Sequence, residues 1–177
     1  MNTTVDLRDV PETMLWPLWN RAAEQQRSDK LLHDPLSAML VESIDYDFEK
    51  SFGRPSAGHP IRARLIDDAI REWLGKHPLG AIVALGEGLE SQYWRVDNGQ
   101  MRWYSVDLPE AIDVRERFLP HNERIQSIAC SALDEQWMDC VPQSEPLFIT
   151  MAGLLMYFEE EQVARLLERI ADRFPGS

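Results

Sequence analysis

The five-residue apolar run Ala81–Leu85 ends at Gly86-Glu87-Gly88, and this junction constrains the fold more than any other stretch of the chain. A short, uninterrupted apolar run is typical of a strand buried on both faces of a parallel sheet. Glycine then lets the backbone turn sharply and approach a ligand closely. A second apolar run, Met101–Val106, leads to Asp107, 21 residues after Gly86. Open α/β sheets place an acidic side chain there to bind ribose hydroxyls, so the sequence predicts an adenosine-cofactor site.

The acidic residues in the turn bear on which cofactor fits. Pyrophosphate binds bare N–H groups at a helix N-terminus, but Glu87 and Glu90 would meet it with like charge. S-adenosylmethionine carries adenine, ribose and a sulfonium but no phosphate, so it is favoured. A nicotinamide-dependent oxidoreductase is a disfavoured alternative, because Ser91 stands where Gly-x-Gly-x-x-Gly has its third glycine. A purely structural explanation also remains open, since Gly-x-Gly occurs wherever a sheet packs tightly against a helix.

Strand and helix patterns alternate along the chain. We expect strands at 81–85, 101–106, 124–129 and 146–151, and helices at 12–26, 61–74, 109–119 and 159–174, with a further helix opened by Asp34-Pro35. Residues 51–60, rich in Gly and Pro, are expected to form a loop or mobile flap. The alternation predicts βαβ units and an α/β fold with a parallel sheet.

Helical spacing predicts which side chains face the core. The inward stripe expected for the second long helix is Ile61, Leu65, Ile66, Ala69, Ile70, Trp73 and Leu74. Trp16, Trp19 and Trp73 are expected in the core rather than in contact with a substrate.

Composition excludes several classes of protein. A net charge of −12 and no basic run argue against nucleic-acid binding. The longest mostly apolar run, Phe148–Phe158, is far shorter than the roughly 20 residues of a membrane helix. The segment Met1–Asp6 lacks the basic and apolar regions of a secretory signal. Cys130 and Cys140 form no Cys-x-x-Cys, so we expect no disulfide scaffold and no metal site, in a cytoplasmic protein.

Several segments in the same order resemble the leucine carboxyl methyltransferase-like family of O-methyltransferases, which includes enzymes of polyketide biosynthesis. The matching segments are Arg62–Ala69, Val83–Arg95 with Val-Ala-Leu-Gly-Glu-Gly-Leu-Glu-Ser-Gln, Trp103–Glu110, Ser131–Asp134 with Trp137, Gly153–Tyr157 and Arg173–Gly176. The resemblance implies a class I (Rossmann-like) methyltransferase sheet with N-terminal covering helices. Family members continue beyond the position of Ser177, so the C-terminal strands are expected to be missing.

The resemblance also implies a division of the chain and a chemistry. Residues 1–60 would form an N-terminal helical cap and flap, and residues 61–177 a partial S-adenosylmethionine-binding α/β core, within one structural domain overall. The implied activity is methyl transfer from S-adenosylmethionine to an oxygen, typically a carboxylate of a small molecule. A carboxylate with a pKa near ~4 is already ionised at pH 7 and needs no general base.

Site residues follow from the same resemblance. Arg62 would bind the carboxylate of the cofactor, Gly86 and Gly88 its amino-acid and ribose portion, and Asp107 the ribose hydroxyls. Ser131 and Leu133 would lie beside adenine, with Ser131 supplying one hydrogen bond. The resemblance places Tyr157 on the substrate side, as the candidate catalytic residue.

Each of these residues has a structural alternative. Asp107 would then only cap the helix that Pro109 begins, and Tyr157 would be part of the core. His121 is the available base for a phenol or alcohol acceptor, while His33, His59 and His77 show no metal-ligand spacing.

An alternative function is a degenerate, non-catalytic binding or assembly module on the same fold. Glu90-Ser91-Gln92, Ala132 and Ala152 depart from the usual family residues and motivate it. The fourth strand is apolar, and leaving it at a sheet edge would favour pairing with another copy of the chain.

Overall fold

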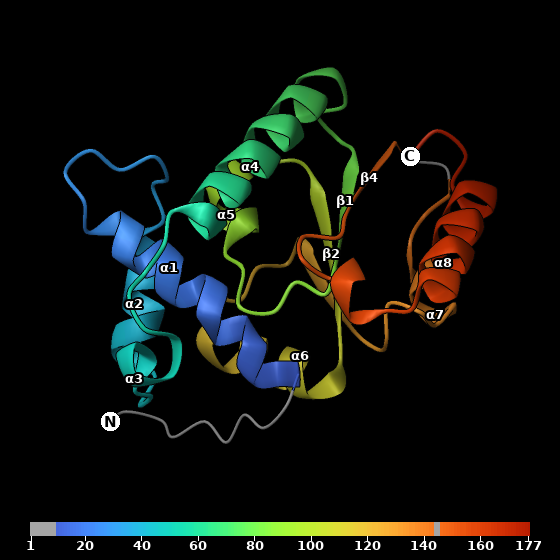
Figure 1. The fold of residues 1–177 in the computed structure, drawn as a ribbon. Coiled ribbons are helices and arrows are strands. Elements are labelled where there is room, and N and C mark those ends of the chain that lie inside the picture. Colours follow the sequence, from blue (N-terminus) through green and yellow to red (C-terminus); the bar gives the residue numbers. More distant parts are fainter. Residues whose placement is uncertain (1–9, 144–145) are drawn as a thin grey trace.

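A computed structural model describes residues 10–143 and 146–177 of the chain, so the N-terminal segment Met1–Asp6 lies outside the described residues. Four parallel strands form one sheet: β1 (Ala81–Leu85), β2 (Arg102–Asp107), β3 (Ile125–Ala129) and β4 (Leu147–Thr150). Their order in the sheet is β3-β2-β1-β4 (Figure 1). The predicted α/β fold with a parallel sheet is therefore confirmed, and the carboxyl ends of β1, β2 and β4 meet at one edge.

Helices connect the strands and cover both faces of the sheet, as parallel strands require crossover connections. Figure 1 places α7 and α8 on one side of the sheet, and α1, α4 and α5 on the other. The helical elements are η1 (Val10–Met14), α1 (Leu15–Gln25), α2 (Pro35–Ser43), α3 (Phe48–Phe52), α4 (Gly58–Lys76), α5 (Gln92–Val96), α6 (Pro109–Phe118), α7 (Gln136–Cys140), η2 (Leu155–Tyr157) and α8 (Glu160–Arg173).

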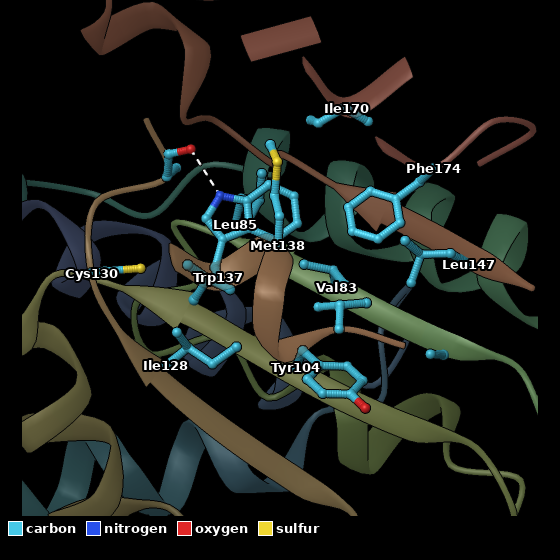
Figure 2. Packing of buried hydrophobic residues seen from close by; sticks show 14 of the residues in the cluster. Val83, Leu85, Tyr104, Ile128, Cys130, Trp137, Met138, Leu147, Ile170 and Phe174 are labelled. Atoms are coloured by element: carbon cyan, nitrogen blue, oxygen red, sulfur yellow. Dashed lines mark hydrogen bonds between the residues drawn. The ribbon is translucent and has the colours of Figure 1, made fainter. Parts of the chain in front are cut away.

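Strand β1 is buried along its whole length, as the apolar run predicts. Successive side chains of a strand point to opposite faces. Val83 and Leu85 belong to the apolar cluster beneath α7 and α8, whereas Ile82 belongs to the cluster beneath α4 and α5. Figure 2 shows the first of these clusters around Trp137, whose indole N–H donates to the Ala132 carbonyl at 3.1 Å. Burial on both faces makes β1 a rigid base for the turn that follows it.

The N-terminal helices form a third cluster with α6, built around Leu15, Leu18, Leu40 and Val114. Asp34 caps α2 as the sequence predicts, because its carboxylate accepts the main-chain N–H of Ser37 at 3.2 Å. The covering helices therefore pack next to the segments that follow β1 and β2.

Two predictions for α4 and the segment before it are wrong in part. Helix α3 ends at Phe52 and α4 begins at Gly58, so both ends of the expected loop 51–60 are helical. Ile66, Ile70, Trp73 and Leu74 of the predicted stripe do pack in the core. The buried face also carries Asp67, however, while Ile61 is 43% and Leu65 is 65% exposed. Asp67 takes a buried position because Arg95 donates to its carboxylate at 2.7 and 3.0 Å. A buried ion pair thus sets the rotation of the helix, which apolar spacing alone could not indicate.

Strand β4 pairs with β1 and has no second neighbour within the described residues, as expected for the fourth strand. Across those same residues, no helix combines the length and apolar character needed to cross a bilayer.

Candidate functional site

A pocket of about 400 Å³ opens at the carboxyl ends of β1 and β4. Its walls come from α1, from the first turn of α4, and from the segments that follow β2 and β4. Five of the seven predicted site residues line it: Arg62, Gly86, Gly88, Asp107 and Tyr157. Residues from four distant parts of the sequence therefore meet at the turn that the Gly-x-Gly motif predicts.

Both glycines of the turn are required by the backbone. Gly86 has φ of 64° and Gly88 has φ of 54°, a region that other residues rarely adopt. A Cβ at Gly86 would lie 2.6 Å from the side chain of Leu154, and one at Gly88 would lie 2.7 Å from the Cβ of Met14. The structural explanation for the motif therefore holds, and it places the bare backbone on the pocket wall.

Asp107 holds the turn from the end of β2. One carboxylate oxygen accepts the Gly88 N–H at 2.7 Å and the other accepts the Leu108 N–H at 2.8 Å. Burial raises the pKa of Asp107, although these bonds and the charge of Arg115 act in the opposite direction. A carboxylate has about four acceptor positions, so two remain for ligand hydroxyls. Leu108, not Asp107, is the N-cap of α6, so the capping alternative is wrong.

Arg115 of α6 binds two residues of the glycine turn, Gly88 and Glu87. Its guanidinium donates to the carbonyl of Gly88 and lies 2.9 Å from the Glu87 carboxylate. Trp103 donates its indole N–H to the same carboxylate at 3.2 Å. Burial raises the pKa of Glu87, and Arg115 opposes that effect. The Glu87 side chain is 2% exposed, and Arg115 compensates its charge at the wall of the pocket, which Glu87 helps to line.

Arg21 of α1 and Arg95 of α5 hold the next part of the loop. Arg21 donates to the Leu89 carbonyl at 2.7 Å and lies 2.9 Å from the Glu90 carboxylate. Arg95 lies 2.7 Å from the other oxygen of Glu90, and both arginines contact Asp34. Burial alone would raise the pKa of Glu90, but the two arginines outweigh it and lower that pKa to about 2. Glu90 is therefore ionised, and its negative charge is compensated by Arg21 and Arg95.

Arg62 differs from these arginines. It lines the pocket and has no hydrogen-bond or ion-pair partner among residues 10–143 and 146–177. Its guanidinium lies against Gly153, where a Cβ would come within 2.7 Å of the Nη1 atom. Gly153 has φ of 80°. An uncompensated cation on a pocket wall is a binding position for an anionic group.

Ser131 and Leu133 lie outside this pocket. They follow β3, whose last residue Ala129 is in register with Asp107. The Ser131 hydroxyl accepts the Leu133 N–H at 3.2 Å, and Leu133 packs against the cluster drawn in Figure 2. The structure therefore brings these two residues to the correct edge of the sheet but not to the wall of the pocket.

Two aromatic residues of the pocket, Trp16 and His59, were not predicted from the sequence. Trp16 is 48% exposed, so its predicted place in the core is wrong. The His59 ring meets it edge to face, with the ring centroids 5.0 Å apart. His59 and Arg62 are three residues apart, and this spacing places two side chains on the same face of a helix. It could have indicated that His59 lies beside Arg62. His121 lines a different pocket, between α6 and β3.

Comparisons with known proteins point to one family. The model of the leucine carboxyl methyltransferase family matches residues 15–171. The chain is 30% identical to the tetracenomycin polyketide synthesis O-methyltransferase of Streptomyces glaucescens, over 99% of this chain and 66% of that protein. It is 27% identical to an S-adenosyl-L-methionine-dependent methyltransferase of Gibberella zeae, over 98% of this chain and 64% of that protein.

A solved structure is also similar. The human N-acetylserotonin methyltransferase in complex with S-adenosylmethionine aligns with a TM-score of 0.44 and 17% identity, over 89% of this chain and 50% of that chain. The present chain thus spans about two thirds of the length of the curated relatives that it matches.

Proposed function

The chain belongs to the leucine carboxyl methyltransferase family, and from that premise we propose that it transfers a methyl group from S-adenosylmethionine to an oxygen of a small molecule. Membership confirms the resemblance drawn from the sequence, together with the Rossmann-like class I methyltransferase fold that it implies. The relatives carry the names of methyltransferases that depend on this cofactor or act in polyketide synthesis. They do not favour the alternative of a non-catalytic module.

The observation that carries the proposal is the shared pocket of Arg62 and Asp107, on either side of the glycine turn. S-adenosylmethionine has a carboxylate at one end and ribose hydroxyls further along. The Arg62 guanidinium, which no described residue pairs with, is available for the carboxylate, and Asp107 has acceptor positions left for the hydroxyls. The pocket volume of about 400 Å³ lies within the usual range for small-molecule sites. The residues present therefore fit this cofactor.

The other site residues take the roles that the family pattern suggests. The backbone at Gly86 and Gly88 lines the amino-acid and ribose portions, and Tyr157 faces the substrate. The family pattern suggests Ser131 and Leu133 as contacts of adenine, and they remain part of the proposal. Within the pocket itself, the wall beside Asp107 is formed by Leu108 and Ala111. Those two side chains supply an apolar surface on which a purine ring can pack.

The bound cofactor supplies an electrophilic methyl group on a sulfonium. The chain must align the acceptor oxygen with that group and keep water away from both. A carboxylate acceptor, as the sequence predicts, is already ionised at neutral pH. A hydroxyl acceptor needs a base in the pocket. Pairing of two copies through the edge of β4 remains a prediction.

Binding of S-adenosylhomocysteine, measured by calorimetry, tests the proposal. The matched ligand is 5′-methylthioadenosine, which keeps the adenosine but lacks the amino-acid carboxylate. We expect Arg62→Leu to weaken binding of S-adenosylhomocysteine about tenfold to a hundredfold, since a hydrogen bond to a charged group contributes roughly 1.5–3 kcal/mol. Binding of 5′-methylthioadenosine should change little.

Arg64→Leu is the control variant, because Arg64 lies on the exposed side of the same helix and pairs with Asp68 at 2.7 Å. The proposal fails if S-adenosylhomocysteine does not bind at millimolar concentration, or if Arg62→Leu weakens both ligands equally.

A further inference from the structure

We propose that Arg115 is the positioning residue of the ribose site, and that Glu87, the acidic residue between the two glycines, orients it. In this arrangement Arg115 fixes the loop to which Asp107 is bonded, and Asp107 binds the ribose hydroxyls of the cofactor. The inference rests on the proposed function, because it assigns the residues that act on the cofactor through Asp107 and not a further contact of the cofactor itself.

The first step is the way in which Gly88 is held. Its N–H donates to the Asp107 carboxylate at 2.7 Å, and its carbonyl accepts from the Arg115 guanidinium. These two bonds flank the φ and ψ angles of Gly88. Glycine has no side chain to restrict those angles, and φ is 54° here. The two bonds together therefore fix the conformation of Gly88, and loss of the bond from Arg115 would leave Asp107 bonded to a flexible residue.

The second step is the set of loop atoms that Arg115 reaches from α6. Its Nη1 atom donates to the carbonyls of Gly88 and Glu90, and its Nη2 atom lies 2.9 Å from the Glu87 carboxylate. A guanidinium is planar and presents its donors in a fixed fork, so it holds the three loop residues in one geometry. Asp107 lines the pocket, whereas Arg115 is absent from the wall that the described residues form. Its effect on a ligand is therefore indirect.

The third step is the role of the glutamate in the motif. The Oε2 atom of Glu87 accepts the indole N–H of Trp103 at 3.2 Å and lies 2.9 Å from the Arg115 guanidinium. Trp103 is fully buried on β2, so it gives the carboxylate a fixed position. The Arg115 side chain is 4% exposed, and a buried cation without a counter-charge is costly. Glu87 supplies that counter-charge and sets the direction of the guanidinium.

The fourth step is the charge that Arg115 brings near Asp107. Burial raises the pKa of Asp107, whereas its bonds from Gly88 and Leu108 and the charge of Arg115 lower it. The carboxylate must be ionised to accept from two main-chain N–H groups and two hydroxyls, because a protonated oxygen becomes a donor. Loss of Arg115 would therefore weaken ribose binding in two ways, by freeing the loop and by favouring the protonated form of Asp107.

The test compares S-adenosylhomocysteine with its 2′,3′-dideoxy analogue, which lacks only the ribose hydroxyls. Calorimetry on the whole chain gives the ratio of the two affinities. In the unaltered protein we expect S-adenosylhomocysteine to bind about tenfold to a hundredfold more tightly than the analogue, as hydrogen bonds to a charged group allow. The ratio reports the hydroxyl contacts, since a loss of folded protein weakens the apparent binding of both ligands alike.

Variants of the pair then separate positioning from stability. Arg115→Met should make the two ligands bind about equally well, whereas Arg115→Lys, which keeps a cation but not the fork, should give an intermediate ratio. Glu87→Gln alone should also lower the ratio, because the guanidinium loses its fixed counter-charge. Arg115→Met leaves the charge of Glu87 buried without its partner, so the double variant Arg115→Met/Glu87→Gln repeats the measurement without that penalty. The control Arg117→Met replaces an exposed arginine of the same helix and should leave the ratio unchanged.

The inference is overturned, with the proposed function intact, if S-adenosylhomocysteine binds and the Arg115 variants lower both affinities by the same factor. Equal binding of the two ligands to the unaltered protein overturns it too, and that measurement needs no variant. An unchanged ratio in Glu87→Gln overturns the orienting role of Glu87. Absence of S-adenosylhomocysteine binding would instead remove the proposed function itself.

Discussion

The carboxylate of Asp107 accepts the main-chain N–H of Gly88 at 2.7 Å and so ties the end of β2 to the turn that follows β1. The two segments are already neighbours, because Leu85 and Val106 are paired in the sheet. A carboxylate that holds the glycine turn also lies on the wall of the pocket beside it. The side chain that holds the turn is therefore also the one that we propose for ribose binding.

Asp107→Asn should weaken binding of both S-adenosylhomocysteine and 5′-methylthioadenosine, because both carry the ribose. An amide presents one acceptor oxygen and one donor nitrogen, so it cannot accept from Gly88, Leu108 and two hydroxyls together. We expect a loss of about tenfold to a hundredfold for each ligand, measured by calorimetry. Asp113→Asn, at an exposed position of α6, is the control. Equal affinities in all three proteins would contradict a role for Asp107 in binding ribose.

Gly153→Ala should displace Arg62. Its Cβ would lie 2.7 Å from the Arg62 Nη1 atom, so the guanidinium must move. Gly99→Ala is a matched control, because Gly99 also has φ of 80° but has open space around it. Both variants carry the same backbone strain of roughly 1–2 kcal/mol. S-adenosylhomocysteine should bind about tenfold more weakly to Gly153→Ala only, if Arg62 binds its carboxylate.

A similar loss of affinity in Gly99→Ala would mean that backbone strain, rather than the position of Arg62, sets the affinity.

Arg21→Met should strongly destabilise the protein. The Arg21 side chain is 2% exposed and pairs with Asp34 and Glu90, so its removal leaves buried carboxylates without this cation. Breaking such a buried pair costs about 3–5 kcal/mol of unfolding free energy, which urea denaturation would measure. Arg27→Met removes a side chain that is 56% exposed and should cost less than about 1 kcal/mol. Comparable losses in the two variants would contradict the buried network.

The contribution of Glu90 to stability should depend on pH. Its folded-state pKa of about 2 lies below that of the unfolded chain, so ionised Glu90 favours the folded state. The contribution is complete above the unfolded pKa of about 4.3 and is lost as the pH falls towards 2. We expect Glu90→Gln to lower the unfolding free energy by at most about 3 kcal/mol at pH 7, and by much less near pH 2.

Denaturation of both proteins at several pH values gives this difference. A difference that stays constant from pH 7 to about pH 2 would show that the charge of Glu90 is not the source of its effect.

Local patterns in the sequence determined where strands and helices follow one another along the chain. They also placed Gly86, Gly88 and Asp107 at strand ends, because burial on both faces of β1 demands an apolar run and the turn demands glycine. The family pattern added Arg62 and Tyr157, and the pocket contains both.

Only the tertiary structure decided which side chains meet. Trp16 and His59 become neighbours because α1 packs against α4, and periodicity within either helix carries no information about that contact. The ion pairs of Arg21, Arg95 and Arg115 likewise join elements that are distant in the sequence. They compensate the charges of Glu87 and Glu90, which the motif alone suggests would face a ligand. Spacing along the chain encodes how each element buries its own faces, whereas the charge and shape of a pocket arise from the docking of several elements at once.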